Sequence, residues 1–149
     1  MRVGQFCNRE VVMMHGDESV KVAAALMRSH HVGDVVLVEE KEGKKFPIGI
    51  ISDRDLVVEV MVPGLKPEEL AASDIITHSL FVVHEDDSLF DALDLMREKA
   101  IRRLPVIDAD EVLIGIITLD DITDLLAEML GNVADVVERQ RELETKQRP

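Results

Sequence analysis

The chain contains one structural unit twice, and this repeat constrains its fold more than any other feature of the sequence. The clearest copies are Gly49–Asp55, which reads Gly-Ile-Ile-Ser-Asp-Arg-Asp, and Gly115–Asp121, which reads Gly-Ile-Ile-Thr-Leu-Asp-Asp. In each copy an apolar run typical of a buried strand ends at a hydroxyl residue, which favours a helix N-cap. The aspartate that closes each motif would lie in the first helical turn, where the helix dipole favours a carboxylate. The same strand-to-helix unit is therefore expected at two places.

The residues around the two motifs repeat as well. The first copy predicts an extended run at 11–14, a helix at 20–27, strands at 35–38 and 48–51, and a helix from Leu56. The second copy predicts the same elements at 80–83, 89–96, 104–107 and 114–117, with a helix from Ile122. Apolar residues recur at helical spacing in both amphipathic helices. The sequence therefore predicts an α/β fold of the α+β kind, built as β-α-β-β-α twice.

The two copies are separated by a stretch rich in proline and glycine. Residues 62–67 read Val-Pro-Gly-Leu-Lys-Pro, and Pro67 suits the first position of a short helical turn. We expect a first domain at 1–62, a linker at 63–71, a second domain at 72–131 and a helical tail at 132–149. Each copy alone would leave an apolar sheet face exposed, so the two sheets are expected to pack on each other about a pseudo-twofold axis.

The composition argues against several classes of function. With 17 basic and 30 acidic residues the formal net charge is −13, which repels nucleic acids and anionic membrane surfaces. No apolar run is long enough to span a bilayer, so we expect a soluble cytoplasmic protein. The single cysteine, Cys7, excludes an internal disulfide and aligns with Ile76, which predicts a small buried side chain. We expect no metal site, because His30 and His31 lack partners at ligand spacing.

With both copies laid out, the chain resembles a tandem pair of cystathionine-beta-synthase (CBS) domains, often called a Bateman module. The resemblance rests on the two glycine motifs and on residues 101–107, Ile-Arg-Arg-Leu-Pro-Val-Ile, which are similar to the family's second-strand signature. It implies a stand-alone, non-enzymatic sensor that binds an adenine nucleotide or a related adenosyl compound and signals to an unknown protein. AMP, ADP or ATP would be the regulatory ligand, NADH and S-adenosylmethionine are further candidates, and no cofactor is obligatory.

The resemblance also implies which residues contact the ligand. Asp55 and Asp121 would accept the ribose hydroxyls. The hydroxyls of Ser52 and Thr118, with the backbone amides that follow them, would face the phosphates. An apolar floor for the base is expected from four strand residues: Val35, Val36, Leu104 and Pro105. The remaining expected contacts are Asn8, Asp53, Arg54, Thr77, Arg102 and Arg103.

Two of these roles have simpler alternatives. Asp55 and Asp121 can serve only as helix-start carboxylates, without any ligand. Arg102 and Arg103 can be a solvated pair, although adjacent guanidinium groups beside an apolar strand suit a phosphate.

The charges around the two expected clefts differ. In the family that the chain resembles, residues at the second-strand entry reach a ligand whose ribose is held by the other copy. Arg54, Arg102 and Arg103 would then gather in the Asp55 cleft. The Asp121 cleft would instead gather Asp34 and Asp120. We therefore expect one phosphorylated nucleotide per chain in the Asp55 cleft, and an empty Asp121 cleft or one that holds an uncharged or cationic adenosyl compound.

A second hypothesis is an interaction scaffold whose clefts are vestigial and whose work is dimerisation. Under either hypothesis we expect a homodimer that forms through the helices. A seam of alternating four-residue and three-residue spacings supports it. Its members are Ile122, Leu126, Met129, Val133, Val136, Gln140 and Leu143. The sequence leaves open whether Gly131 and Asn132 break this helix. An enzyme acting on nucleotides is the least favoured hypothesis, because no catalytic constellation is present.

Overall fold

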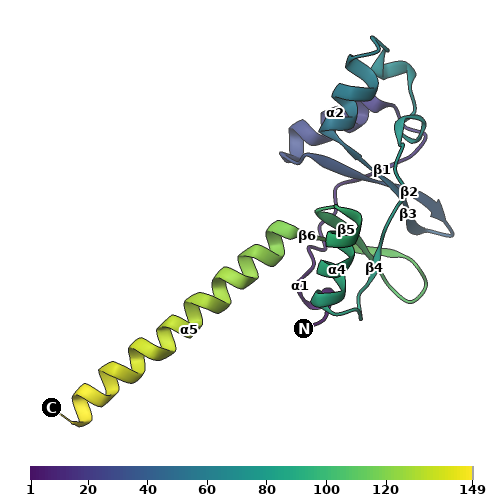
Figure 1. Ribbon diagram of the computed structural model, residues 1–149. Helices are drawn as coiled ribbons and strands as arrows, with labels where there is room; N and C mark the ends of the chain where they lie inside the picture. The colour runs from purple at the N-terminus through teal and green to yellow at the C-terminus, as the bar shows by residue number, and fades with distance from the viewer. Residues whose placement is uncertain (149) are drawn as a thin grey trace.

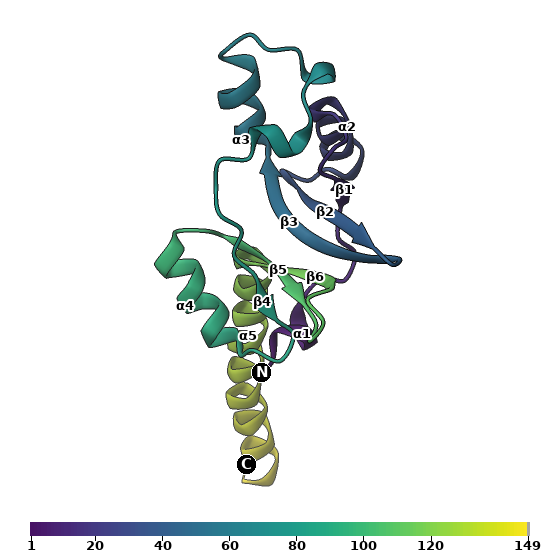
Figure 2. The same cartoon turned by 90° about the vertical axis from the view of Figure 1, so that its right-hand side faces the viewer.

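Two three-stranded sheets of identical topology lie face to face, with helices on their outer sides, in the computed structural model, which describes residues 1–148 (Figures 1 and 2). In each sheet the first pair of strands is parallel and the second pair is antiparallel. The strands are β1 (Met13–His15), β2 (Asp34–Lys41), β3 (Lys44–Ser52), β4 (Val83–His84), β5 (Arg103–Ile107) and β6 (Leu113–Thr118).

The helical segments complete the two copies of the repeat. The α-helices are α1 (Val3–Phe6), α2 (Val20–His30), α3 (Asp53–Leu56), α4 (Leu89–Lys99) and α5 (Leu119–Gln147). A π-helical segment η1 (Val57–Met61) continues α3, and two 3-10 segments, η2 (Pro67–Glu69) and η3 (Ala72–Ile75), lie between the repeats. The expected α/β fold with two equivalent repeats is confirmed.

Several element boundaries differ from the sequence-based expectation. The first strand of each repeat starts later and is shorter than expected, because only Met13–His15 and Val83–His84 pair with β2 and β5. The closing helices start earlier, at Asp53 and Leu119, because Ser52 and Thr118 cap them directly.

Alternation along β2 separates two apolar cores. Val35 and Leu37 point into the core beneath α2 and η1, while Val36 and Val38 point toward the other sheet and meet Leu113. All four β2 residues are at most 2% exposed. The sheets thus pack through a shared core, as expected from two half-sized units that each carry an apolar face.

The segment that precedes each repeat crosses between the two units. Val3 of α1 is fully buried in the core of the second repeat, and Ala72 of η3 is fully buried in the core of the first. Asn8 exchanges two backbone hydrogen bonds of 2.9 Å with Ile116. The short helix α1 was not expected from the sequence.

The glycine of each motif makes room for these crossing segments. A Cβ atom on Gly115 would lie 2.8 Å from Cys7 Sγ and 2.9 Å from the Asn8 carbonyl oxygen. A Cβ atom on Gly49 would lie 2.6 Å from Ile76 Cδ1, at the equivalent place. Cys7 is half-buried here, and burial raises the pKa of its thiol. Cys7 and Ile76 therefore play the same packing role in the two repeats.

Helix α5 continues through Gly131 without a break and extends far beyond the second sheet (Figure 1). Every residue from Leu126 to Arg148 is exposed. Within residues 1–148, no helix combines the length and the apolarity needed to cross a membrane. The tail is therefore a long helix with a polar side and an uncovered apolar side.

We expect Gly115→Ala to lower the free energy of unfolding by about 1 to 3 kcal/mol, because the added methyl group overpacks a site walled by backbone. Chemical denaturation followed by circular dichroism measures this loss. Gly131→Ala is the matched control, since its Cβ meets nothing within 4 Å and alanine favours a helix by about 1 kcal/mol. Equal stability of Gly115→Ala and the natural protein would contradict the close approach.

Candidate functional site

Each glycine motif ends in a reciprocal capping box. Ser52 Oγ accepts a hydrogen bond from the Asp55 amide at 3.1 Å, and Asp55 Oδ2 accepts one from the Ser52 amide at 2.8 Å. Thr118 and Asp121 form the same two bonds, both at 3.1 Å. Within residues 1–148, the Oδ1 atom of each aspartate accepts no hydrogen bond. Each carboxylate therefore holds its helix start with one oxygen and keeps the other available.

One cleft, of about 340 Å³, lies between the two repeats beside Asp55, and we call it the Asp55 cleft. The first repeat contributes polar and charged groups from β2, the end of β3 and α3. The second repeat contributes the segment before β4 and the entry to β5. The lining residues are Asp34, Ile50, Ser52, Arg54, Asp55, His78, Ser79, Leu80, Phe81, Ala100, Ile101, Arg102 and Arg103.

A second cleft, of about 280 Å³, lies beside Asp121 and is built from equivalent segments with the two repeats exchanged. We call it the Asp121 cleft. Its lining residues are Asn8, Glu10, Val11, Val12, His31, Val32, Gly33, Asp34, Val36, Arg103, Ile116, Thr118 and Asp121. The strand-entry residues of one repeat thus lie in the same cleft as the motif aspartate of the other repeat.

The two clefts differ in charge. Arg54, Arg102 and Arg103 line the Asp55 cleft together with two aspartates. The Asp121 cleft contains three carboxylates, those of Glu10, Asp34 and Asp121, and Arg103 is its single arginine. An anionic ligand is therefore better matched to the Asp55 cleft.

The expected place of Asp120 is wrong. Its carboxylate does not line the Asp121 cleft, and it accepts a hydrogen bond from Arg102 at 3.2 Å. Both side chains are largely exposed, so this surface pair holds Arg102 only weakly.

Asp34 and Arg103 form an ion pair across the boundary between the repeats. Asp34 is 11% exposed and Arg103 is 38% exposed at the side chain. Burial raises the pKa of Asp34, the nearby Asp53 carboxylate raises it further, and the Arg103 guanidinium opposes both effects. Both partners line both clefts, so this pair is common to the two candidate sites.

Of the four residues expected to form an apolar floor, the structure brings one to a cleft. Val35 and Leu104 point into the separate cores of the two repeats, and the buried Pro105 lines neither cleft. Only Val36 reaches a cleft, the one beside Asp121. The apolar lining of the Asp55 cleft comes from four other residues: Ile50, Leu80, Phe81 and Ile101.

The backbone amides expected to face phosphates in the Asp55 cleft are already engaged. The Asp53 amide donates to the Gly33 carbonyl oxygen at 2.8 Å, and the Arg54 amide donates to Asp53 Oδ1 at 2.8 Å. The Asp55 amide is used by the capping box. A phosphate in this cleft would therefore depend on arginine side chains.

Two other expected contacts fall outside the clefts, and several lining residues were missed. Asp53 and Thr77 line neither cleft, whereas Asn8 lines the Asp121 cleft. The missed residues of the Asp55 cleft are Ile50 and those at 78–81 and 100–101. Apart from Arg9, the equivalents of residues 78–81 and 100–101 in the first repeat line the other cleft. The two sets thus come from the same two segments of each repeat, the one before its first strand and the one before its second strand.

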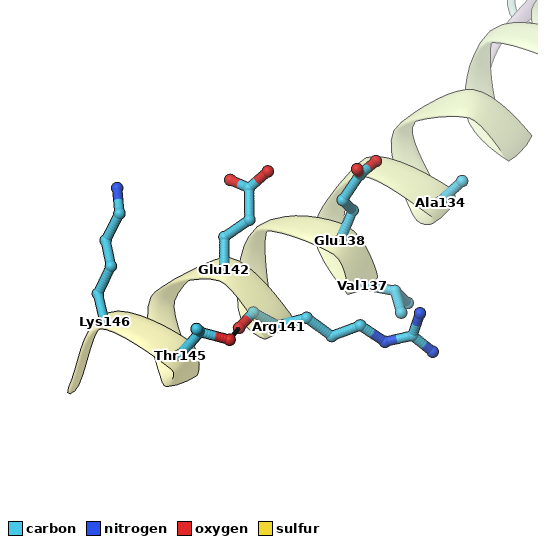
Figure 3. Close-up of a pocket in the computed structure, with 7 residues that line it drawn as sticks. All are labelled: Ala134, Val137, Glu138, Arg141, Glu142, Thr145 and Lys146. Carbon is cyan, nitrogen blue, oxygen red and sulfur yellow. Dashed lines mark hydrogen bonds between the residues drawn. The ribbon is translucent and has the colours of Figure 1, made fainter. Parts of the chain in front are cut away.

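A further surface depression lies along the end of α5 and is not enclosed. Figure 3 shows that its side chains all come from this one helix, with Thr145 Oγ1 donating to the Arg141 carbonyl oxygen at 2.9 Å. Glu138 and Glu142 project from it beside Lys146. With no second element facing these side chains, the depression is not a candidate ligand site.

We expect Ser52→Ala to lower the free energy of unfolding of the ligand-free protein by about 0.5 to 2 kcal/mol, because the Asp55 amide loses its acceptor. Thermal and denaturant unfolding measure the loss. Ser52→Thr is the control, since a hydroxyl in the Thr118 arrangement restores the cap. An unchanged stability of Ser52→Ala would show that the capping box contributes nothing.

Comparison with known proteins places this geometry in a family. The family model of the CBS domain matches the chain twice, at residues 3–62 and 72–128. An uncharacterized protein of Methanopyrus kandleri is 38% identical over 140 residues, which cover 94% of this chain and 70% of that relative.

Two solved structures have the same fold. A CBS domain protein from Pyrobaculum aerophilum complexed with AMP has a TM-score of 0.72 at 23% identity, covering 81% of this chain and 89% of that one. A CBS domain pair in complex with 5′-methylthioadenosine and S-adenosyl-L-methionine has a TM-score of 0.73 at 24% identity, covering 87% and 98%. Because the family model matches most of the chain, this protein belongs to the CBS domain family and carries two consecutive CBS domains.

Proposed function

We propose that this protein is a non-enzymatic sensor that binds an adenine nucleotide in the Asp55 cleft and transmits the binding state to another protein. The observation that carries the proposal is the composition of this cleft. It combines an available carboxylate oxygen on Asp55, an apolar wall and three arginines. A ribose, a base and a phosphate need these three kinds of partner.

Each part of the nucleotide has a matching group in the cleft. Asp55 Oδ1 would accept a ribose hydroxyl while Oδ2 keeps the helix cap. Arg54 and Arg102 supply guanidinium donors for phosphate oxygens. Phe81 offers an aromatic surface for the base, and Lys99 Nζ lies 5.1 Å from the centroid of its ring.

The Asp121 cleft suits a different ligand. Its three carboxylates disfavour a phosphate and favour an uncharged or cationic adenosyl compound. The structures of related proteins with AMP, and with 5′-methylthioadenosine and S-adenosyl-L-methionine, support adenosyl ligands in this fold. Neither cleft contains a nucleophile paired with a base, which supports binding rather than turnover.

We expect calorimetric titration with AMP to show one site per chain. Asp55→Ala is expected to abolish binding, because the ribose loses its acceptor. Asp121→Ala is the matched control, since it loses the same kind of helix cap in the other repeat and is expected to keep AMP binding. For the natural protein, AMP at 100 times its dissociation constant is expected to stabilise the fold by about 2.7 kcal/mol in thermal unfolding.

Two results would contradict this assignment. Two equivalent AMP sites per chain would show that the charge difference does not select between the clefts. AMP binding that is lost in Asp121→Ala but kept in Asp55→Ala would assign the nucleotide to the other cleft.

A second candidate function, a dimerisation scaffold, is favoured by the uncovered face of α5. Leu126, Val133, Val136 and Leu143 are each more than half exposed and lie along one seam of the helix. An isolated helix is marginally stable in water, so the tail gains most if a second copy of this chain covers the seam. The two functions are compatible, because no residue of α5 beyond Asp121 lines either cleft.

The charges beside the seam favour a parallel pair of tails. In a heptad assignment with Leu126 and Val133 at a, Arg139 falls at g and Glu144 at e. A parallel pair places Arg139 opposite Glu144 of a second copy, and Gln140 opposite its own counterpart, where a polar pair fixes the register. Within residues 1–148, Arg139 forms no ion pair inside its own chain.

We expect deletion of residues 132–149 to weaken self-association, measured by sedimentation at micromolar concentration, because it removes most of the seam. In a Cys7→Ala background, Leu143→Cys is expected to give a disulfide-linked dimer on mild oxidation, since parallel tails place this position beside itself. Glu138→Cys, which points away from the seam, is the control. A monomeric natural protein, or efficient cross-linking of the control alone, would contradict the parallel pair.

A further inference from the structure

The ion pair between Asp34 and Arg103 belongs to both clefts at once. Asp34 opens β2 and Arg103 opens β5, so the two residues occupy the same position in the two repeats. Asp34 Oδ2 and Arg103 Nε are shielded from solvent, and each side chain lines both the Asp55 cleft and the Asp121 cleft. A ligand that changes the partner of one side chain therefore affects both sites.

Neither side chain can lose its partner without consequence. The side chain of Asp34 is largely shielded from solvent and lies near the carboxylate of Asp53, and this environment already raises its pKa. If Arg103 turns to another anion, Asp34 is left as a poorly solvated carboxylate, which is unfavourable unless a new positive charge replaces the guanidinium. Glu10 and Asp121 line the same cleft, so the site left behind is strongly acidic.

We propose that this ion pair couples the two clefts, so that an anionic ligand in the Asp55 cleft promotes binding of a cationic ligand in the Asp121 cleft. The inference rests on the proposed function, because it requires an anionic nucleotide beside Asp55. The phosphate draws Arg103 toward the Asp55 cleft, and the released Asp34 then attracts the cationic ligand. A second anionic ligand in the Asp121 cleft is disfavoured for the same reason.

The coupling acts in both directions. If AMP increases the affinity for a cationic ligand by some factor, the cationic ligand increases the affinity for AMP by the same factor. The effect requires that each ligand prefers one arrangement of the ion pair over the other. Both preferences follow from charge, since phosphate favours the arrangement with Arg103 in the Asp55 cleft and a cation favours the arrangement with Asp34 exposed to the Asp121 cleft.

The test is a calorimetric titration of the full chain with AMP, in the absence and presence of saturating S-adenosylmethionine, whose sulfonium is cationic, and the reverse titration. We expect S-adenosylmethionine to tighten AMP binding about 5-fold or more, with the same factor in reverse. 5′-Methylthioadenosine, an uncharged sulfide, is the ligand control and is expected to leave the affinity for AMP nearly unchanged.

Two variants distinguish the effect of the ion pair on coupling from the effect of the other residues of the Asp55 cleft on AMP binding. Asp34→Asn is expected to reduce the coupling factor to about 1 while tightening AMP binding, because Arg103 no longer has a competing partner. Arg102→Gln is the matched control. This arginine lines the Asp55 cleft alone, so its loss is expected to weaken AMP binding and to keep the coupling factor.

The outcomes distinguish this inference from the proposed function. A coupling factor of about 1 in the natural protein, or a factor retained in Asp34→Asn, would overturn the inference and leave nucleotide binding intact. Failure of S-adenosylmethionine to bind the AMP-loaded protein would overturn it as well. Absence of any AMP binding would overturn both proposals. If Asp34→Asn does not fold, Arg103→Gln replaces it, with the same expected loss of coupling but weaker AMP binding.

Discussion

The crossing of the two leading segments between the repeats is the constraint on which the rest of the structure depends. Val3 completes the core of the second repeat, and the backbone of Asn8 pairs with Ile116 on its last strand. The chain enters the wall of the Asp121 cleft directly after this pairing, and the segment that follows Ile76 enters the wall of the Asp55 cleft in the same way. The same segments therefore hold the repeats together and shape the clefts. Their close approach requires glycine at position 115, where a Cβ atom would meet the Asn8 backbone, and at position 49 a Cβ atom would displace the end of the Ile76 side chain.

The capping boxes explain why the motif aspartates have two roles. Asp55 and Asp121 each satisfy a backbone amide at a helix start through one oxygen. Because a carboxylate has two oxygens, the structural role leaves capacity for a ligand. The helix-start interpretation and the ligand-binding interpretation are thus not alternatives for these residues.

The sequence was sufficient to predict the features that follow from the repeat. The two sheets, the helix N-caps at Ser52 and Thr118 and the shared core all come from patterns that occur twice. The apolar floor could not be predicted reliably, because adjacent strand residues point to opposite faces and β2 is apolar on both. Because Val35 and Val36 are the same residue type, the sequence does not indicate which of them faces the core of the first repeat and which faces the other sheet. Helix α1 was missed because it has four residues and is held by contacts with a distant part of the chain, such as the bond from Gly4 to Glu85.

The capping box at Thr118 and Asp121 also forms the start of α5, the helix that continues into the long tail. A helix of 29 residues is about 43 Å long. Its first two turns are anchored, because Thr118 and Asp121 line one cleft and Ile122 and Leu125 pack in the core of the second repeat, whereas the turns from Leu126 onward are exposed. A tilt of about 5° at the anchor would displace the far end by about 4 Å over this length. In the proposed sensor function, the tail would act as a lever arm that converts a small rearrangement around a bound molecule into a larger displacement at its far end.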